Sequence, residues 1–154
     1  RLEKDGKVWA PYYTLHKIFA GLLDAHSLRG NAEALGVAAQ FGDWVVARTS
    51  RLSDGQLQKA LDTEHGGINE SMANLYALTG KAAYLQAARR LCHACVLDPL
   101  AAGEDKLSGL HANTQFPKVI GAARLYELTG EARYRELAEM YAFMLDQLGV
   151  DAGK

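Results

Sequence analysis

The sequence lacks most of the features that mark a specialised class of protein. Two cysteines among 154 residues cannot build a disulfide framework. The 17 basic and 18 acidic side chains leave a formal charge of −1, so no basic face favours nucleic acid. No apolar run approaches the roughly 18 residues that a membrane span needs. We therefore expect neither nucleic acid nor a membrane as a partner, and the composition leaves the compartment open.

What is present is an ordinary globular composition, with 49% apolar and 23% charged residues. The length suits one domain. The chain starts at Arg1 without an initiator methionine and stops at Gly-Lys, just after a helical pattern. We interpret residues 1–154 as part of one domain that is truncated at both ends.

Apolar residues recur at spacings of three and four, and alternating strand patterns are nearly missing, which predicts an all-α fold. Pro11 and Pro117 suit the first turns of helices, and Pro99 suits a position after a helix. Six helices are predicted, over 11–28, 31–49, 67–79, 81–96, 116–129 and 131–148.

An internal repeat organises these helices. Residues 75–80 read Leu-Tyr-Ala-Leu-Thr-Gly, and residues 125–130 read Leu-Tyr-Glu-Leu-Thr-Gly, fifty positions later. Gly30 occupies the same place one repeat earlier, and each glycine follows a helix directly. Three antiparallel hairpins result, with long connections over 50–66 and 97–115 at one end. An open solenoid and a closed α/α toroid both fit, and three hairpins would form half of a six-hairpin ring.

The loops before the second and third glycine-preceding helices hold the candidate site residues. His65 and Asn69 belong to the first loop, and His111, Asn113 and Gln115 belong to the second. Such neutral side chains donate and accept hydrogen bonds, which suits sugar hydroxyls better than phosphate. Helix capping by Asn69, Asn113 or Thr114, with a Gly66-Gly67 turn, explains the same residues equally well.

Aromatic residues begin the first glycine-preceding helix at the equivalent place, where Trp9, Tyr12, Tyr13 and His16 occur. Their rings could stack on a sugar, although core packing explains any one of them more simply.

Cys92-His93-Ala94-Cys95 resembles a metal or redox motif but falls inside a predicted helix. A zinc site needs further ligands, and the chain has no second cysteine pair. We therefore expect both cysteines to act as small core residues and no metal to bind this chain.

Several motifs together resemble one known family. They are Trp-Ala-Pro-Tyr-Tyr-Thr-Leu-His-Lys at 9–17, Thr-Glu-His-Gly-Gly-Ile-Asn-Glu at 63–70, Leu-Asp-Pro-Leu-Ala at 97–101 and Gly-Leu-His-Ala-Asn-Thr-Gln at 109–115. In this order they are similar to glycoside hydrolase family 127, the β-L-arabinofuranosidase-like enzymes formerly described as a domain of unknown function. The resemblance implies the first half of an (α/α)6 toroid that continues beyond Lys154 into β-rich domains.

The resemblance also implies a reaction, the retaining hydrolysis of terminal β-L-arabinofuranosyl residues of plant-type glycans. In that family a zinc-bound cysteine thiolate is the nucleophile and a glutamate is the acid/base, and both belong to Glu-x-Cys and neighbouring cysteine motifs. Those motifs do not occur here, so we expect this chain to contain no catalytic residue. We also expect the zinc ligands to lie outside it and the chain alone to be inactive. His65 and His111 match the family's sugar-binding histidines, and Asn69, Asn113 and Gln115 are weaker candidates.

Two other classes of function remain open from the residues alone. The first is another α/α-toroid sugar enzyme, either a hydrolase, a lyase or an epimerase, because a fold does not determine its chemistry. The second is a helical-repeat module that binds a protein partner on its concave face. The oligomeric state is open in every case.

Overall fold

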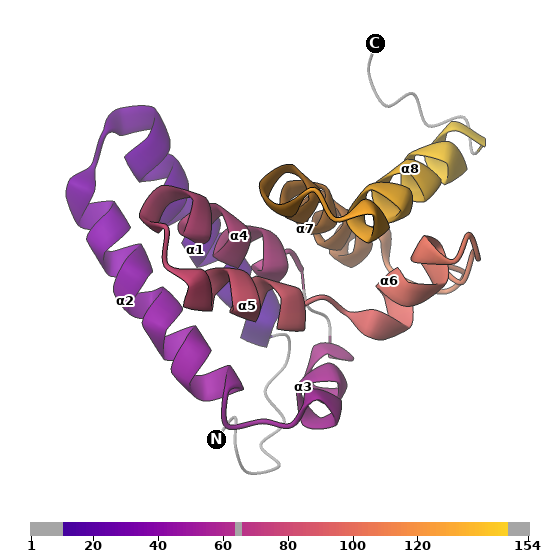
Figure 1. Ribbon diagram of the computed structural model, residues 1–154, viewed down its shortest axis with the longest axis horizontal. Helices are drawn as coiled ribbons and strands as arrows, with labels where there is room; N and C mark the ends of the chain where they lie inside the picture. The colour runs from indigo at the N-terminus through magenta and orange to yellow at the C-terminus, as the bar shows by residue number, and fades with distance from the viewer. Residues whose placement is uncertain (1–10, 64–65, 148–154) are drawn as a thin grey trace.

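A computed structural model describes residues 11–63 and 66–147. The ordered elements of this part of the chain are all helices, without a strand, which confirms the all-α prediction (Figure 1). The eight helices described are α1 (Pro11–Arg29), α2 (Ala32–Thr49), α3 (Asp54–Leu61), α4 (Ile68–Thr79), α5 (Ala82–Arg90), α6 (Ala94–Ala101), α7 (Ala112–Thr129) and α8 (Ala132–Gln147). None of these helices combines the length and apolar character needed to cross a membrane.

The predicted repeat is present as three hairpins, α1–α2, α4–α5 and α7–α8. Gly30, Gly80 and Gly130 close the first helix of each hairpin in the left-handed conformation, with φ of 66°, 70° and 70°. The last two turns also share a hydrogen bond from a threonine side chain to the backbone. Thr79 and Thr129 each donate a hydroxyl hydrogen bond of 2.7 Å to the carbonyl four residues earlier. The sequence repeat is therefore a repeat of local structure.

The first helices of the hairpins form one layer, in which α4 packs against α1 on one side and α7 on the other (Figure 1). Helix α2 packs against α5 in the second layer, and α6 lies beside α8. The backbones approach closely where a glycine faces α4. A Cβ added to Gly42 would lie 2.4 Å from Leu75 Cδ2, and one added to Gly121 would lie 2.4 Å from Asn69 Nδ2.

Two short helices occupy the segments that we expected to be long loops. In the connection over 50–66, Ser53 and Gln56 form a capping box that starts α3, and Leu57 and Leu61 are fully buried one turn apart. Helix α6 occupies the first part of the second connection. The expectation of long loops was therefore wrong over 54–61 and 97–101, because eight-residue helices carry too few apolar positions to show a period, whereas residues 102–111 do form a loop.

The predicted helix over 81–96 is interrupted after Arg90, and α6 begins at Ala94. Gln58 of α3 explains the break. Its Nε2 donates to the carbonyls of Arg90 and Cys92, at 3.3 and 3.0 Å, and its Oε1 accepts from the Ala94 amide at 2.8 Å. One side chain from α3 thus satisfies the backbone groups that the interruption leaves unpaired.

The two later prolines do not lie where their spacing suggested. Pro99 is inside α6 rather than after a helix, and Pro117 is inside α7 rather than in its first turn. Each is the sixth residue of its helix, so the break at 91–93 and the earlier start of α7, at Ala112, account for both errors.

Candidate functional site

The N-terminal ends of α1, α4 and α7 meet at one end of the first layer. The Gly67 amide, just before α4, donates to Nδ1 of His16 in α1 at 3.1 Å. Asn113 of α7 donates through Nδ2 to the Tyr13 hydroxyl of α1 at 3.0 Å. Gly67 also touches α7, since an added Cβ would lie 2.9 Å from Pro117 Cβ. The structure therefore brings together the two loops and the helix start that the repeat singled out.

His111 lies exposed at this meeting point, where it is the N-cap of α7. Its Nδ1 accepts a hydrogen bond from the Asn113 amide at 3.2 Å, and Thr114 Oγ1 donates to the His111 carbonyl at 2.9 Å. The alternative in which Asn113 or Thr114 caps this helix is therefore wrong. Because Nδ1 accepts, the proton of the neutral ring lies on Nε2, which is thus a hydrogen-bond donor.

The paired glycines serve close packing against α1. A Cβ on Gly66 would lie 2.9 Å from His16 Nδ1, and one on Gly67 would lie 3.0 Å from His16 Nε2. Gly67 has a φ of −89°, outside the left-handed region. His65, the first of the expected sugar-binding histidines, lies outside the described residues.

His16 is a site residue that the sequence analysis named only among the aromatic residues of its helix. It is 5% exposed, and burial, assisted by the charge of Lys17, lowers the pKa of its ring to about 4. Burial also raises the pKa of the Glu70 carboxyl, whose Oε2 lies 3.9 Å from His16 Nε2. Burial therefore shifts both pKa values toward the neutral forms, and Glu70 places a half-buried carboxyl beside the loops.

We expect His16 to make stability depend on pH. The unfolded ring has a pKa of 6.5 and the folded ring about 4, so the unfolded state binds more protons as the pH falls below 6.5. Between pH 7 and pH 5 the folded state should lose about 2 kcal/mol through this group. Thermal unfolding of the wild type and of His16→Gln at both pH values measures it. Equal losses in the two proteins would contradict the assignment.

Two of the weaker candidates, Asn69 and Gln115, are buried between helices. Asn69 is fully buried, and its Nδ2 donates to the Lys118 carbonyl of α7 at 3.0 Å. Gln115 donates through Nε2 to Thr114 Oγ1 at 2.7 Å and accepts from Lys118 Nζ at 3.0 Å. Asn69 thus joins α4 to α7 and has no surface to offer a sugar, whereas Asn113 remains exposed beside His111.

A cavity of about 430 Å³ extends from His111 toward α3 and α6. Its polar lining comes from the caps and first turns of α6 and α7, the C-cap of α3 and the loop before α7: Asp62, His93, Cys95, Lys106, His111, Thr114, Gln115 and Lys118. Lys118 is 2% exposed, and burial lowers the pKa of its amine to about 8. The cavity therefore connects the exposed His111 to a buried polar network.

The Cys92–Cys95 segment does not lie inside one helix, so that expectation was wrong. His93 is the N-cap of α6 and Cys95 is an exposed residue of its first turn. Burial raises the pKa of the Cys92 thiol to about 12, which keeps this thiol protonated and fits the packing role expected for it. Cys95 instead contacts a histidine, with Sγ 3.0 Å from His93 Nε2.

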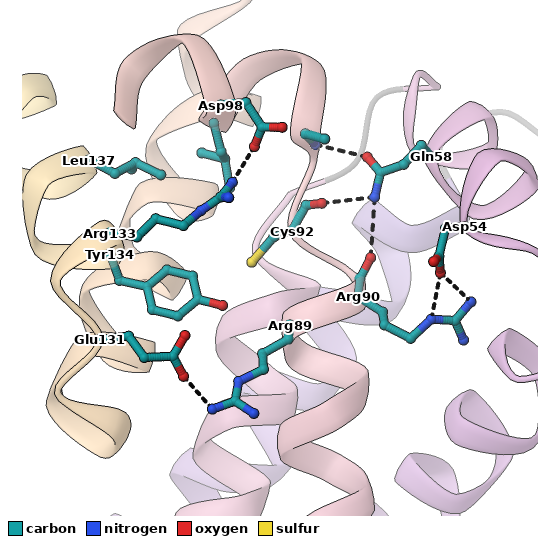
Figure 2. A pocket seen from close by; sticks show the side chains of 12 residues that line it. Asp54, Gln58, Arg89, Arg90, Cys92, Asp98, Glu131, Arg133, Tyr134 and Leu137 are labelled. Atoms are coloured by element: carbon teal, nitrogen blue, oxygen red, sulfur yellow. Dashed lines mark hydrogen bonds and ion pairs between the residues drawn. The ribbon is translucent and has the colours of Figure 1, made fainter. Parts of the chain in front are cut away.

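A second cavity, of about 390 Å³, lies between α3, α5, α6 and α8 (Figure 2). Three arginines line it, and each has a carboxylate partner: Arg89 with Glu131, Arg90 with Asp54 and Arg133 with Asp98. The Tyr134 ring and the Cys92 sulfur point toward its interior (Figure 2). Because its charges are balanced, this cavity has no excess of positive charge to attract an anion.

The fold and site define a class of helical-hairpin domain with a polar site at one end of a layer, and the neutral hydrogen-bonding side chains there suit carbohydrate hydroxyls. The comparison with family models agrees with this class, because the β-L-arabinofuranosidase GH127 catalytic domain matches residues 1–145. The chain belongs to this glycoside hydrolase family, as its motifs predicted. The comparison with curated proteins gave no significant match.

Proposed function

We propose that this chain forms the substrate-recognition part of an enzyme that hydrolyses terminal β-L-arabinofuranosides of plant-type glycans with retention. The observation that carries the proposal is the convergence of the first helices of the three repeats beside the N-cap of α7, where His111 is exposed, in a chain whose family match implies a carbohydrate substrate. The polar groups there are neutral and directional, as recognition of hydroxyl groups requires.

The hydrogen bonds within the site assign a role to each exposed group. Nε2 of His111 donates to a sugar oxygen, because Nδ1 already accepts from the backbone. Oδ1 of Asn113 accepts from a sugar hydroxyl, because its Nδ2 is engaged by Tyr13. Gln115 and Asn69 support the site from beneath its surface. Both are buried, and each hydrogen-bonds to Lys118.

The groups that break the glycosidic bond lie outside this chain in our proposal. In the family resemblance a zinc ion activates a cysteine thiolate, but the Glu-x-Cys motif that supplies its ligands does not occur in this sequence. The residues present therefore do not fit that zinc centre. Neither Cys92, buried and protonated, nor Cys95 is assigned as the nucleophile.

Hydrolysis of p-nitrophenyl β-L-arabinofuranoside by the full-length protein tests the proposal. We expect release of p-nitrophenol that a zinc chelator abolishes, and no release from the matched α-L-arabinofuranoside or β-L-arabinopyranoside. Activity on a different sugar only would retain the glycoside hydrolase class and overturn the substrate. No activity on any glycoside, from a folded protein that binds a protein partner, would favour the binding module.

A further inference from the structure

Asp62, His93 and Cys95 form a cluster that neither the family motifs nor the proposed function uses. His93 Nε2 lies 3.1 Å from Asp62 Oδ1 and 3.0 Å from Cys95 Sγ, and the sulfur lies 3.9 Å from the same carboxylate oxygen. In the described part of the chain this is the group of three such donors that could hold a metal ion. We propose that these three side chains bind a zinc-class divalent cation, which departs from our expectation that no metal binds here.

The spacing of the donor atoms suits tetrahedral zinc. Bonds of about 2.3 Å to sulfur and 2.0–2.2 Å to nitrogen and oxygen place such donors roughly 3.3–3.7 Å apart. The observed separations of 3.0–3.9 Å need shifts of about 0.3–0.5 Å to match, the largest between the Cys95 sulfur and His93 Nε2. A thiolate, an imidazole and a carboxylate are ligands that zinc accepts together, whereas magnesium and calcium prefer oxygen alone.

The surrounding residues position each ligand. Lys118 Nζ lies 2.9 Å from His93 Nδ1, so the other ring nitrogen, Nε2, is the one that faces Asp62 and Cys95. Gln58 holds the end of α3 against the start of α6 through its three hydrogen bonds, two of them to the carbonyls of Arg90 and Cys92 (Figure 2). Asp62 is the C-cap of α3 and His93 the N-cap of α6, so this junction sets their distance.

The charges of the ligands and the access to them suit a divalent cation, although Lys118 Nζ beside His93 adds a positive charge that a bound ion must displace or deprotonate. The Asp62 carboxylate and the Cys95 thiolate together balance two positive charges. Binding releases two protons, one from the Cys95 thiol and one from the His93–Lys118 pair, which then shares the ring proton on Nδ1. Asp62 and Cys95 are exposed, so an ion can enter. The fourth position of the tetrahedron faces the cavity of about 430 Å³ and would hold water there.

Metal binding to the full-length protein tests this site without an activity measurement. The protein is stripped with a chelator, dialysed and titrated with Co(II), whose thiolate charge-transfer absorption reports a cysteine ligand. We expect Cys95→Ser and Asp62→Asn to bind one equivalent fewer than the wild type at micromolar Co(II). The loss in affinity at this site should exceed the roughly 10- to 100-fold effect of losing an outer-shell partner. Both positions are exposed, so these substitutions should not prevent folding.

Cys92→Ala is the matched control, because it removes the neighbouring cysteine without touching a proposed ligand. It should bind as many equivalents as the wild type and keep the full charge-transfer absorption. Added zinc should raise the melting temperature of the wild type and of Cys92→Ala more than that of Cys95→Ser. Equal stoichiometry in the wild type and Cys95→Ser, or an equal loss in Cys92→Ala, would overturn the proposal. The hydrolysis assay is independent of this result, because it reports on the sugar and not on this cluster.

Discussion

Replacing His111 with asparagine is expected to lower kcat/KM of the full-length protein on a β-L-arabinofuranoside by roughly 100-fold. The imidazole is exposed, and its Nε2 proton is free to bind the substrate because Nδ1 accepts from the Asn113 amide. A site built to hydrogen-bond a hydroxyl loses about 3 kcal/mol of transition-state stabilisation when one partner is missing. Steady-state hydrolysis of the p-nitrophenyl glycoside measures the loss.

Asparagine is chosen because His111 has a second role as the N-cap of α7. Asparagine caps helices well, so His111→Asn should unfold at nearly the wild-type temperature, whereas His111→Ala should lose about 1 kcal/mol of stability as well. His26→Asn provides a control histidine at the other end of α1, beyond the site, and should leave kcat/KM unchanged. If His111→Asn keeps wild-type kcat/KM, then His111 is only a cap and does not contact the sugar.

The repeat was the part of the fold that sequence predicted well, for a physical reason. Gly80 and Gly130 end their helices in a conformation that glycine adopts without strain, so the residue type itself reports the local structure. The break between α5 and α6 gave no such signal. The break depends on Gln58, which is more than thirty positions away in the sequence. Gln58 reaches its partners only once α3 packs against that segment.

The candidate site shows the same division. The convergence of the loops followed from the repeat, because equivalent helix starts must lie at the same end of a layer. Whether a side chain faces the substrate or the core did not follow. Asn69 shares its buried face with Met72 and Ala73, three and four residues later, so helical periodicity contained a signal that its polar character obscured. The cluster of Asp62, His93 and Cys95 could not be predicted, because it forms only where the helix is interrupted between α5 and α6. No local sequence pattern indicates that interruption.

Gly121→Ala is expected to destabilise the domain by about 3 kcal/mol, although alanine normally favours a helix. The added Cβ would lie 2.4–2.6 Å from the three terminal side-chain atoms of Asn69. That amide has nowhere to move, because Asn69 is fully buried and its Nδ2 is held by the Lys118 carbonyl. The melting temperature should therefore fall by several degrees. Gly36→Ala in α2, where nothing lies within 4 Å of an added Cβ, should raise it slightly instead.

A double-mutant cycle with Asn69→Ala separates this clash from a general effect on α7. Removing the amide loses the hydrogen bond to the Lys118 carbonyl and a long one to Cys92 Sγ, but it also removes Oδ1, a buried acceptor that no donor reaches within the described residues. The space that it vacates is the space that the new methyl group needs. The double variant should therefore be at least about 1 kcal/mol more stable than the sum of the single effects predicts. Additive losses would show that α4 and α7 do not meet through this pair, and the layer that positions the loops would need a different contact between them.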